Sequence, residues 1–320
     1  MKLVDIYYSL KKEIKQIENE LLKTVATDQI VLNQSSNHLL KAGGKRIRPV
    51  FVLLSGHFGN YQFDKLKKVA AALELIHMAT LVHDDVIDDA DYRRGKLTVK
   101  AQWDNKVAMY TGDYIFAQGL ILISEFENPE IHHTLSNAIV RMCEGEIDQI
   151  KDFNNWNQSL KQYLRKIKRK TALLIAISCK LGALASNADQ KTVRLLYQYG
   201  YNIGMAFQIT DDILDFTGTV EELGKPVGSD LRQGNITLPA LYALHHSKDK
   251  ERIAELINSD NHNRTEDLIE IIRKSEGIEY SKELAKIYFK KAKDALLQLP
   301  AVNERKTLLE ISDFLSERTY

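Results

Sequence analysis

The amino-acid sequence predicts an all-α protein of roughly ten or more packed helices. Only 5 prolines and 16 glycines interrupt its 320 residues, so few positions force a helix to end. Between them, apolar residues recur at three- and four-residue spacing, as at Leu73, Ile76 and Ala79, which is the period of one helix face. Alternating runs that end in Asn-Gly or Asp-Gly turns are absent. Because no Gly-, Ser- or Pro-rich linker divides the chain, we expect one domain over residues 1–320.

Composition excludes several classes of function. The 44 basic and 43 acidic residues leave a formal charge of +1, so we expect no nucleic-acid partner. The N-terminal segment 1–22 has the pattern of a charged amphipathic helix and lacks the apolar stretch of a signal peptide. No apolar run approaches the roughly 18 residues that span a bilayer, which predicts a cytoplasmic protein with at most peripheral membrane contact. Cys143 and Cys179 lie outside any CxxC or Cys/His cluster and are expected to be reduced core residues.

The first segment that could bind a ligand is GGKRIRP, residues 43–49. It combines a glycine break, three cations in four residues and a proline suited to the start of the next helix. Backbone N–H groups at such a helix start, together with Lys45 and Arg48, would form a diphosphate site. Basic loops before helices are common, so this segment alone does not identify a function.

Two acidic segments carry the strongest functional pattern. DDVID (84–88) and DDILD (211–215) each follow a Met-Ala pair at the same distance. On a helix, carboxylates four residues apart lie on one face, about 5–6 Å from each other. Such like charges beside apolar residues destabilise a helix unless a cation binds, and carboxylates that leave room for water and phosphate oxygens suit Mg²⁺. A single DDxxD is as often a solvated helix face; the repetition favours a metal site.

Further cations accompany the first acidic segment. His77 lies seven residues before Asp84, two turns along the same face, and could donate to a phosphate, although a lone histidine on an apolar helix is more often a core residue. Arg93 and Arg94 follow the segment, and Gly95 is expected to end the helix. These arginines either neutralise the aspartates or hold a diphosphate.

A second basic group precedes and follows DDILD. Lys170 and Thr171 open the apolar run 172–177, so they are expected at the wet end of a helix that lines an apolar cavity. The other charges of segment 161–171 are expected to form a solvated face. Lys225 lies in the glycine-flanked loop after DDILD, where it could close over the same anion.

Together these segments resemble the trans-isoprenyl diphosphate synthase (polyprenyl synthetase) family, from about residue 35 to residue 245. The motifs appear in the family's order: GGKRIRP, HMATLVHDDVIDDADYRRG, KRKTALLI, GMAFQITDDILDFTG and GKPVGSDLRQGNITLPAL. The resemblance implies the isoprenoid synthase fold, with helices around a central apolar cavity. Within the family the chain looks like the large catalytic component II of bacterial heterodimeric heptaprenyl or hexaprenyl diphosphate synthases. That likeness implies a small component I partner, with a homodimer as the alternative.

The resemblance also implies roles for individual residues. Mg²⁺, about three ions per site, would be held by Asp84, Asp85, Asp88, Asp211, Asp212 and Asp215. The allylic diphosphate would be bound by Arg93, Lys170, Thr171, Gln208 and Lys225. Isopentenyl diphosphate would be bound by Lys45, Arg48, His77 and Arg94.

The implied reaction accounts for these residue types. Breaking the allylic C–O bond gives a carbocation, and metals with cations such as Lys170 stabilise the departing pyrophosphate. The isopentenyl double bond then attacks the cation, and the resemblance assigns the lost proton to the released pyrophosphate. No protein nucleophile is needed, in keeping with the absence of a nucleophile elbow. The product would be a long all-trans polyprenyl diphosphate for quinone side chains, with peripheral membrane contact at its release.

Two positions bear on product length and on the diphosphate site. Ala79 and Thr80 lie one turn before Asp84 and are small, where short-chain relatives often carry bulky side chains, so we predict a product of about C30 to C40, with heptaprenyl the best guess. Alternatively, both residues only pack against a neighbouring helix. At Asn235 many short-chain relatives carry lysine, which leaves the diphosphate contact at that corner open.

Three other functions remain as alternatives. A shorter-chain geranylgeranyl diphosphate synthase would use the same motifs. A class I terpene cyclase would carry an asparagine/serine/glutamate motif in place of DDILD. A non-catalytic subunit that binds prenyl diphosphates would be expected to have lost one acidic motif, whereas both are intact here.

Overall fold

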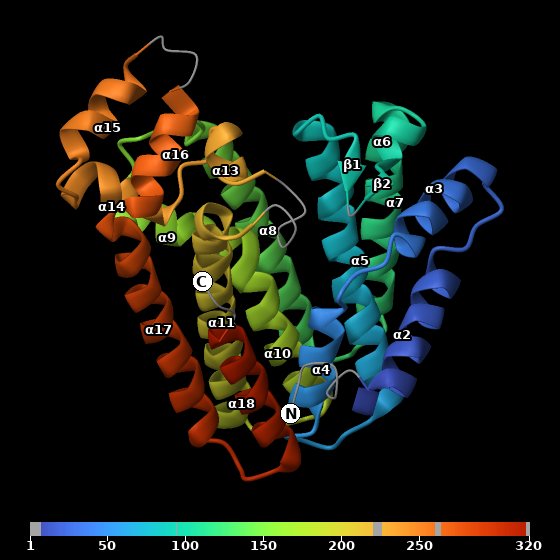
Figure 1. Ribbon diagram of the computed structural model, residues 1–320. Helices are drawn as coiled ribbons and strands as arrows, with labels where there is room; N and C mark the ends of the chain where they lie inside the picture. The colour runs from blue at the N-terminus through green and yellow to red at the C-terminus, as the bar shows by residue number, and fades with distance from the viewer. Residues whose placement is uncertain (1–7, 94, 220–225, 260–263, 318–320) are drawn as a thin grey trace. The chain divides into compact units, whose positions relative to one another are not determined.

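The computed structural model describes residues 8–93, 95–219, 226–259 and 264–317, and these residues are almost entirely helical (Figure 1). The prediction of an all-α fold is confirmed. The helices in chain order are α2 (Lys11–Thr24), α3 (Ile30–Lys41), α4 (Ile47–Gly56), α5 (Phe63–Ile87), α6 (Val99–Gln102), α7 (Asn105–Ser124), α8 (Pro129–Lys151), α9 (Leu160–Ile167), η1 (Lys168–Ala172), α10 (Leu173–Ala185), α11 (Gln190–Thr217), α13 (Ser229–Arg232), α14 (Leu238–His246), α15 (Lys250–Ile257), α16 (Arg264–Lys274), α17 (Glu276–Leu297) and α18 (Asn303–Ser316).

The chain forms two compact units, each assembled from separate stretches of sequence. The first contains Met1–Ser136, Ile177–Leu196 and Pro300–Thr307, and the second contains Asn137–Ala176, Tyr197–Leu299 and Leu308–Tyr320. The acidic segment 84–88 lies in the first unit and the acidic segment 211–215 in the second. The assignment of residues 1–320 to one domain around a central cavity stays a prediction.

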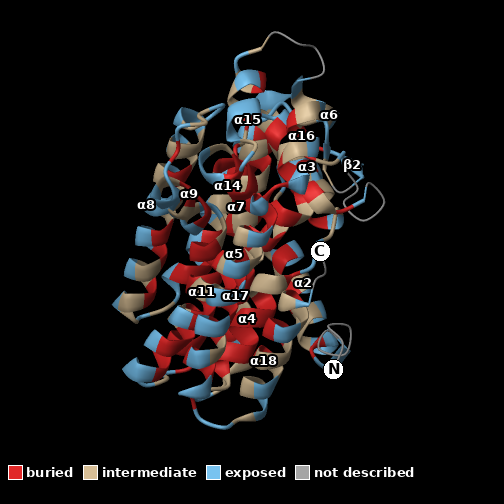
Figure 2. Ribbon diagram, turned by 60° about the vertical axis from the view of Figure 1, so that its left-hand side comes forward, coloured by how far each residue is buried: buried red, intermediate tan, exposed pale blue. Residues whose placement is uncertain are grey.

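Helix α5 is the core of the first unit. Its buried residues run almost without interruption from Val69 to Met78, and α7 packs along it. Figure 2 shows the buried residues of the chain in red. Two glycines of α7 permit this approach: a Cβ at Gly112 would lie 2.3 Å from the His83 ring, and a Cβ at Gly119 would lie 3.1 Å from the Ala72 carbonyl oxygen. The register of α5 is thereby fixed by backbone contact as well as by apolar burial.

Helix α7 (Asn105–Ser124) meets the requirement for a membrane-spanning helix by length and mean hydropathy alone. Charged residues such as Lys106 and Asp113 interrupt its apolar residues, so it contains no apolar run of roughly 18 residues, as expected. Core helices of soluble proteins pass the same test of length and hydropathy, which makes it weak evidence, and α7 packs against α5 and α3.

A short β-hairpin follows α5, which the sequence did not predict. Strand β1 (Tyr92–Arg93) pairs antiparallel with β2 (Lys96–Leu97). Gly95 has a left-handed backbone (φ 73°) and lies in the hairpin turn, a conformation that favours glycine. The expectation that Gly95 ends the helix is therefore wrong: α5 ends at Ile87, and the glycine turns the chain back instead.

In the second unit, α11 packs closely against the start of α10. A Cβ at Gly204 would lie 2.6 Å from the Ala172 Cα, so only glycine permits this contact. Helices α14, α16 and α17 pack on one another, and Tyr199 of α11 donates a hydrogen bond to the Leu308 carbonyl oxygen of α18. Of the two cysteines, Cys179 is buried as expected, whereas Cys143 is exposed and is not a core residue.

Candidate active site

The first acidic segment lies at the C-terminal end of α5. Asp84 and Asp85 belong to the last turn, and Asp88 caps it with its N–H bonded to the Asp84 carbonyl oxygen at 2.8 Å. Because the C-terminal end of a helix carries the negative end of its dipole, carboxylates there are unfavourable without a cation. The predicted helical placement is correct, and the helix dipole adds a reason for cation binding that the spacing did not supply.

Asp85 is held by the hairpin. It is 3% exposed and accepts a hydrogen bond from Arg93 Nε at 2.5 Å. Burial raises the pKa of Asp85 above its usual range, while Arg93 opposes that shift. Arg93 thus lies against the acidic segment as predicted for a residue near the metal cluster, but here it binds the carboxylate itself. Arg94 lies outside the described residues.

The basic segment at residues 43–49 divides into one structural and two candidate binding residues. Arg46 starts α4 with a left-handed backbone (φ 45°), and its buried guanidinium donates to Glu74 of α5 at 2.9 Å. That pair fixes α4 to α5. Lys45 is exposed and Arg48 is half-buried, and their role as diphosphate ligands stays a prediction.

His77 and Thr80 share a helix face with Asp84. All three belong to α5, and spacings of three, four and seven residues place them on one side of it. Thr80 Oγ1 donates to the His77 carbonyl oxygen at 2.8 Å. Ala79 is fully buried and lies on the face between Ile76 and His83, the side that the glycines of α7 contact.

The second acidic segment lies at the C-terminal end of α11 and is tied into a hydrogen-bond network. Asp212 is 3% exposed and accepts from Tyr163 Oη at 2.6 Å and from Gln208 Nε2 at 2.9 Å. Thr171 Oγ1 donates to Gln208 Oε1 at 2.6 Å. The network thus joins α9, η1 and α11, and it contains two residues predicted for the site, Thr171 and Gln208. Asp215, also buried, accepts from the Asp230 N–H at 3.1 Å.

A π-helical turn, η1, presents Lys170 and Thr171. Such turns are rare and often occur at functional sites. Arg169 fixes this turn to α8 through Asp148 at 2.5 Å and Glu144 at 2.7 Å. Lys170 Nζ donates to Gln149 Oε1 at 2.7 Å. The expected wet helix end before the apolar run is present, as Lys170 is exposed and Ala172 is buried, but its π geometry was not predicted.

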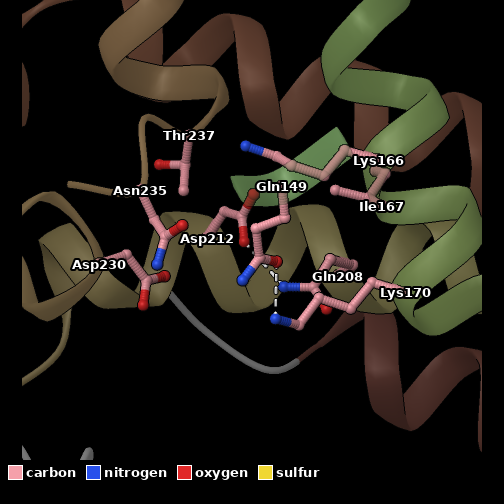
Figure 3. A pocket seen from close by; sticks show the side chains of 9 residues that line it. All are labelled: Gln149, Lys166, Ile167, Lys170, Gln208, Asp212, Asp230, Asn235 and Thr237. Carbon is pink, nitrogen blue, oxygen red and sulfur yellow. Dashed lines mark hydrogen bonds between the residues drawn. The ribbon is translucent and has the colours of Figure 1, made fainter. Parts of the chain in front are cut away.

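These side chains surround a pocket of about 110 Å³ in the second unit (Figure 3). Its lining is polar and of mixed charge: Gln149, Lys166, Ile167, Lys170, Gln208, Asp212, Asp230, Asn235 and Thr237. Burial and the neighbouring Asp230 raise the pKa of Asp212 to about 7. Burial lowers the pKa of Lys166, while Asp212 opposes that shift. Lysines and carboxylates around one small pocket fit an anion held together with a cation.

Comparison with known proteins identifies the family. The sequence matches the polyprenyl synthetase family over residues 29–274. The chain belongs to the polyprenyl synthetase family. It is 54% identical to heptaprenyl diphosphate synthase component 2 of Bacillus subtilis (strain 168), over 100% of this chain and 92% of that protein.

Solved structures of polyprenyl synthetases share the fold over nearly the whole chain. The heptaprenyl diphosphate synthase of Staphylococcus aureus is 45% identical with a TM-score of 0.92, covering 97% of this chain and 99% of that one. The polyprenyl synthase of Caulobacter crescentus CB15, complexed with calcium and isoprenyl diphosphate, is 32% identical with a TM-score of 0.91, covering 99% and 98%. The predicted family and the predicted enzyme class, a prenyltransferase, are therefore confirmed.

The acidic segments 84–88 and 211–215 are the residues that would hold a divalent metal. Among the described residues, no three His, Cys, Asp or Glu side chains are gathered into one metal-binding group. The carboxylates of Asp85 and Asp212 instead accept hydrogen bonds from the side chains of Arg93 and Tyr163. Two-carboxylate motifs that leave the remaining positions to water and substrate oxygens are characteristic of Mg²⁺ sites, so a bound diphosphate would complete the coordination.

Sequence reasoning missed two residues of this site, Tyr163 and Lys166. Both lie in segment 161–171, whose charges other than Lys170 were expected to be solvated, but Lys166 is 8% exposed and Tyr163 is fully buried. Helical spacing could have identified them: Tyr163, Lys166 and Lys170 are three and four residues apart, so they lie on one helix face. Lys225 lies outside the described residues.

Tyr163→Phe tests the network around Asp212. The variant keeps the ring but removes the donor at 2.6 Å, which leaves a buried carboxylate less satisfied. We expect the free energy of unfolding to fall by about 1–3 kcal/mol in metal-free buffer. Urea denaturation measures this loss, and Tyr8→Phe, at an exposed tyrosine, is the control. A loss equal to that of the control would contradict the role of the hydrogen bond.

Proposed function

We propose that this prenyltransferase condenses isopentenyl diphosphate successively with an allylic diphosphate, such as farnesyl diphosphate, to give an all-trans polyprenyl diphosphate of about C30 to C40. The observation that carries the proposal is the pair of acidic motifs, each at the C-terminal end of a long helix. Heptaprenyl diphosphate is the proposed product, as the name of the Bacillus subtilis relative suggests. The reaction would take place in the cytoplasm and supply quinone side chains.

In the proposed site the two acidic motifs bind one diphosphate through Mg²⁺. Bound Mg²⁺ would stabilise the negative charge that develops on the departing pyrophosphate. Asp84, Asp88, Asp211 and Asp215 would supply carboxylate ligands. Asp85 and Asp212 would adjoin them, oriented by Arg93 and by Tyr163 with Gln208. Three metal ions per site and the exact ligand set remain part of the proposal.

The basic residues would bind and orient the substrates. Lys170 would donate to the allylic diphosphate, and the Thr171–Gln208 pair would fix the position of its neighbours. Arg93, Arg94 and Lys225 would add charge around the two substrates. Lys45, Arg48 and His77 would hold isopentenyl diphosphate so that its double bond faces the carbocation. The apolar residues that follow Thr171, Ala172 to Ile177, are buried and would keep water from the cation.

A smaller partner subunit is part of the proposal. The Bacillus subtilis relative is named component 2, which implies a component 1. The purified chain should be incubated with farnesyl diphosphate, isopentenyl diphosphate and Mg²⁺, with and without a candidate small subunit, and the products sized. Elongation only in the mixture would support the heterodimer, full activity alone would remove the partner from the proposal, and no elongation in either would refute the function.

Metal binding should depend on pH through Asp212. Its folded pKa, about 7, is raised above the value of an unfolded aspartate. The folded state therefore binds the proton more tightly, and the contribution of Asp212 to stability falls as pH rises from about 4 through about 7. Since Mg²⁺ needs the ionised carboxylate, we expect MgCl₂ to raise Tm more at pH 8 than at pH 6. Asp212→Asn should lose most of that difference; an equal difference in the variant would contradict the assignment.

A further inference from the structure

Lys166 is a buried cation beside the second acidic motif. It lies on α9 one turn after Tyr163, the hydroxyl donor to Asp212, and is 8% exposed. Its Nζ donates to Gln158 Oε1 at 3.4 Å and to the Ile236 carbonyl oxygen at 3.2 Å. Both acceptors are neutral. No carboxylate of the described residues forms an ion pair with this ammonium, although Asp212 and Asp230 line the same pocket.

The surroundings hold this ammonium in place. Gln158 is 1% exposed, and its Nε2 donates to the carbonyl oxygens of Asn155 at 2.8 Å and Asp152 at 3.3 Å. With the amide nitrogen so engaged, Oε1 is left to accept from Lys166. Ile236, the other acceptor, is fully buried. A lysine held by two fixed neutral oxygens is preorganised and keeps donor capacity for an anion.

The same pocket contains both lysines. Figure 3 shows Lys166 and Lys170 entering the pocket from the same side, from α9 and η1, with Asp212, Asn235 and Thr237 on the other side. Burying a charge without an ionic partner is unfavourable. Residues kept in such positions often serve a site rather than the fold. Asp212 and Asp230 line the same pocket but form no ion pair with Lys166, so a diphosphate in the pocket would supply a counter-charge in direct contact with the ammonium.

We propose that Lys166 is a further diphosphate-binding residue of this chain, a buried cation beside Lys170 on the same side of the Asp212 pocket. The inference rests on the proposed function. It adds one diphosphate-binding residue, at a position that the sequence analysis expected to be solvated. It also answers the question left at Asn235: where short-chain relatives carry a lysine, this chain has a neutral amide, and Lys166 supplies a cation to the same pocket.

The test is binding of inorganic pyrophosphate to the full chain in MgCl₂, measured by calorimetry. Lys166→Met keeps most of the side-chain volume and removes the charge. We expect its pyrophosphate Kd to rise about 10-fold or more, and the KM for the allylic diphosphate to rise while the KM for isopentenyl diphosphate changes little. Lys161→Met, at an exposed lysine of the same helix, should bind pyrophosphate as the parent does.

Thermal unfolding separates this role from a structural one. Because the removed charge has no ionic partner, Lys166→Met should keep a Tm within about 3 °C of the parent, or higher. A lower Tm with unchanged pyrophosphate affinity would show that Lys166 only supports the fold, and would overturn the inference. Unchanged pyrophosphate affinity of Lys166→Met would overturn the inference whatever its Tm.

Two variants at Asn235 complete the test. Lys166→Met with Asn235→Lys moves the cation to the opposite wall of the pocket, and should recover most of the lost pyrophosphate affinity. Asn235→Asp leaves Lys166 in place and adds a carboxylate, and should weaken pyrophosphate binding even if Lys166→Met does not fold. Failure of both expectations would exclude phosphate from this pocket. A chain that binds pyrophosphate but elongates nothing would refute the proposed function alone.

Discussion

Asp84→Asn and Asp211→Asn are each expected to lower kcat by about a thousandfold. Each substitution keeps the size of the side chain but removes one carboxylate of the proposed Mg²⁺ site at the end of α5 or of α11. The negative end of the helix dipole lies at the same place and favours a bound cation there. Product formation from radiolabelled isopentenyl diphosphate measures the loss. Asp64→Asn, at an exposed aspartate in the first turn of α5, is the matched control and should retain parental activity.

The double variant tests whether the two motifs act on one pyrophosphate. If they share it, Asp84→Asn and Asp211→Asn together should reduce kcat little more than either alone, because residues that act as a unit are not additive. Independent sites would instead multiply the two losses. A multiplied loss would contradict the proposal that segments 84–88 and 211–215, which lie in different compact units, meet at one substrate.

The sequence predicted the helices and the acidic motifs because both depend on short-range spacing. Apolar residues three and four apart define a helix face wherever the face is buried, so the helical placement of Asp84 and Asp211 needed no knowledge of distant contacts. The roles of Lys45 and Arg48 stay predictions, and Arg46 between them turns inward to Glu74. That inward turn depends on a residue 28 positions away and could not be predicted from the loop.

The features that were missed depend on long-range contacts. The π-turn at Lys168–Ala172 carries Arg169, which binds Asp148 and Glu144 of α8, and no local pattern specifies that pairing. Lys166 was assigned to a solvated face because lysine is rarely buried, and one of its two acceptors, the Ile236 carbonyl oxygen, comes from a distant part of the chain. The hairpin around Gly95 was overlooked because its strands have two residues each, too few for an alternating pattern.

Thr80→Phe is expected to shorten the product by several isoprene units. Thr80 lies one turn before Asp84 on the same face of α5, and one turn of helix, about 5.4 Å, is comparable to the length of one five-carbon unit. A phenyl ring there would stop the tail close to the diphosphate, so products of about C15 to C20 should replace those of about C30 to C40. Thin-layer chromatography of the dephosphorylated products measures the change. Thr80→Val, which removes the hydroxyl without adding length, should leave the product unchanged.

Ala79→Phe distinguishes a wall of the tail cavity from ordinary packing. Ala79 is fully buried on the side of α5 that faces α7, so a phenyl ring there should shorten the product and also cost about 1–3 kcal/mol of unfolding free energy through overpacking. Thr80 is half-buried, and its phenylalanine variant should shorten the product with a smaller loss. If Ala79→Phe is destabilised while its products keep their length, this residue only packs against α7. The limit on chain length would then lie elsewhere along the predicted apolar cavity.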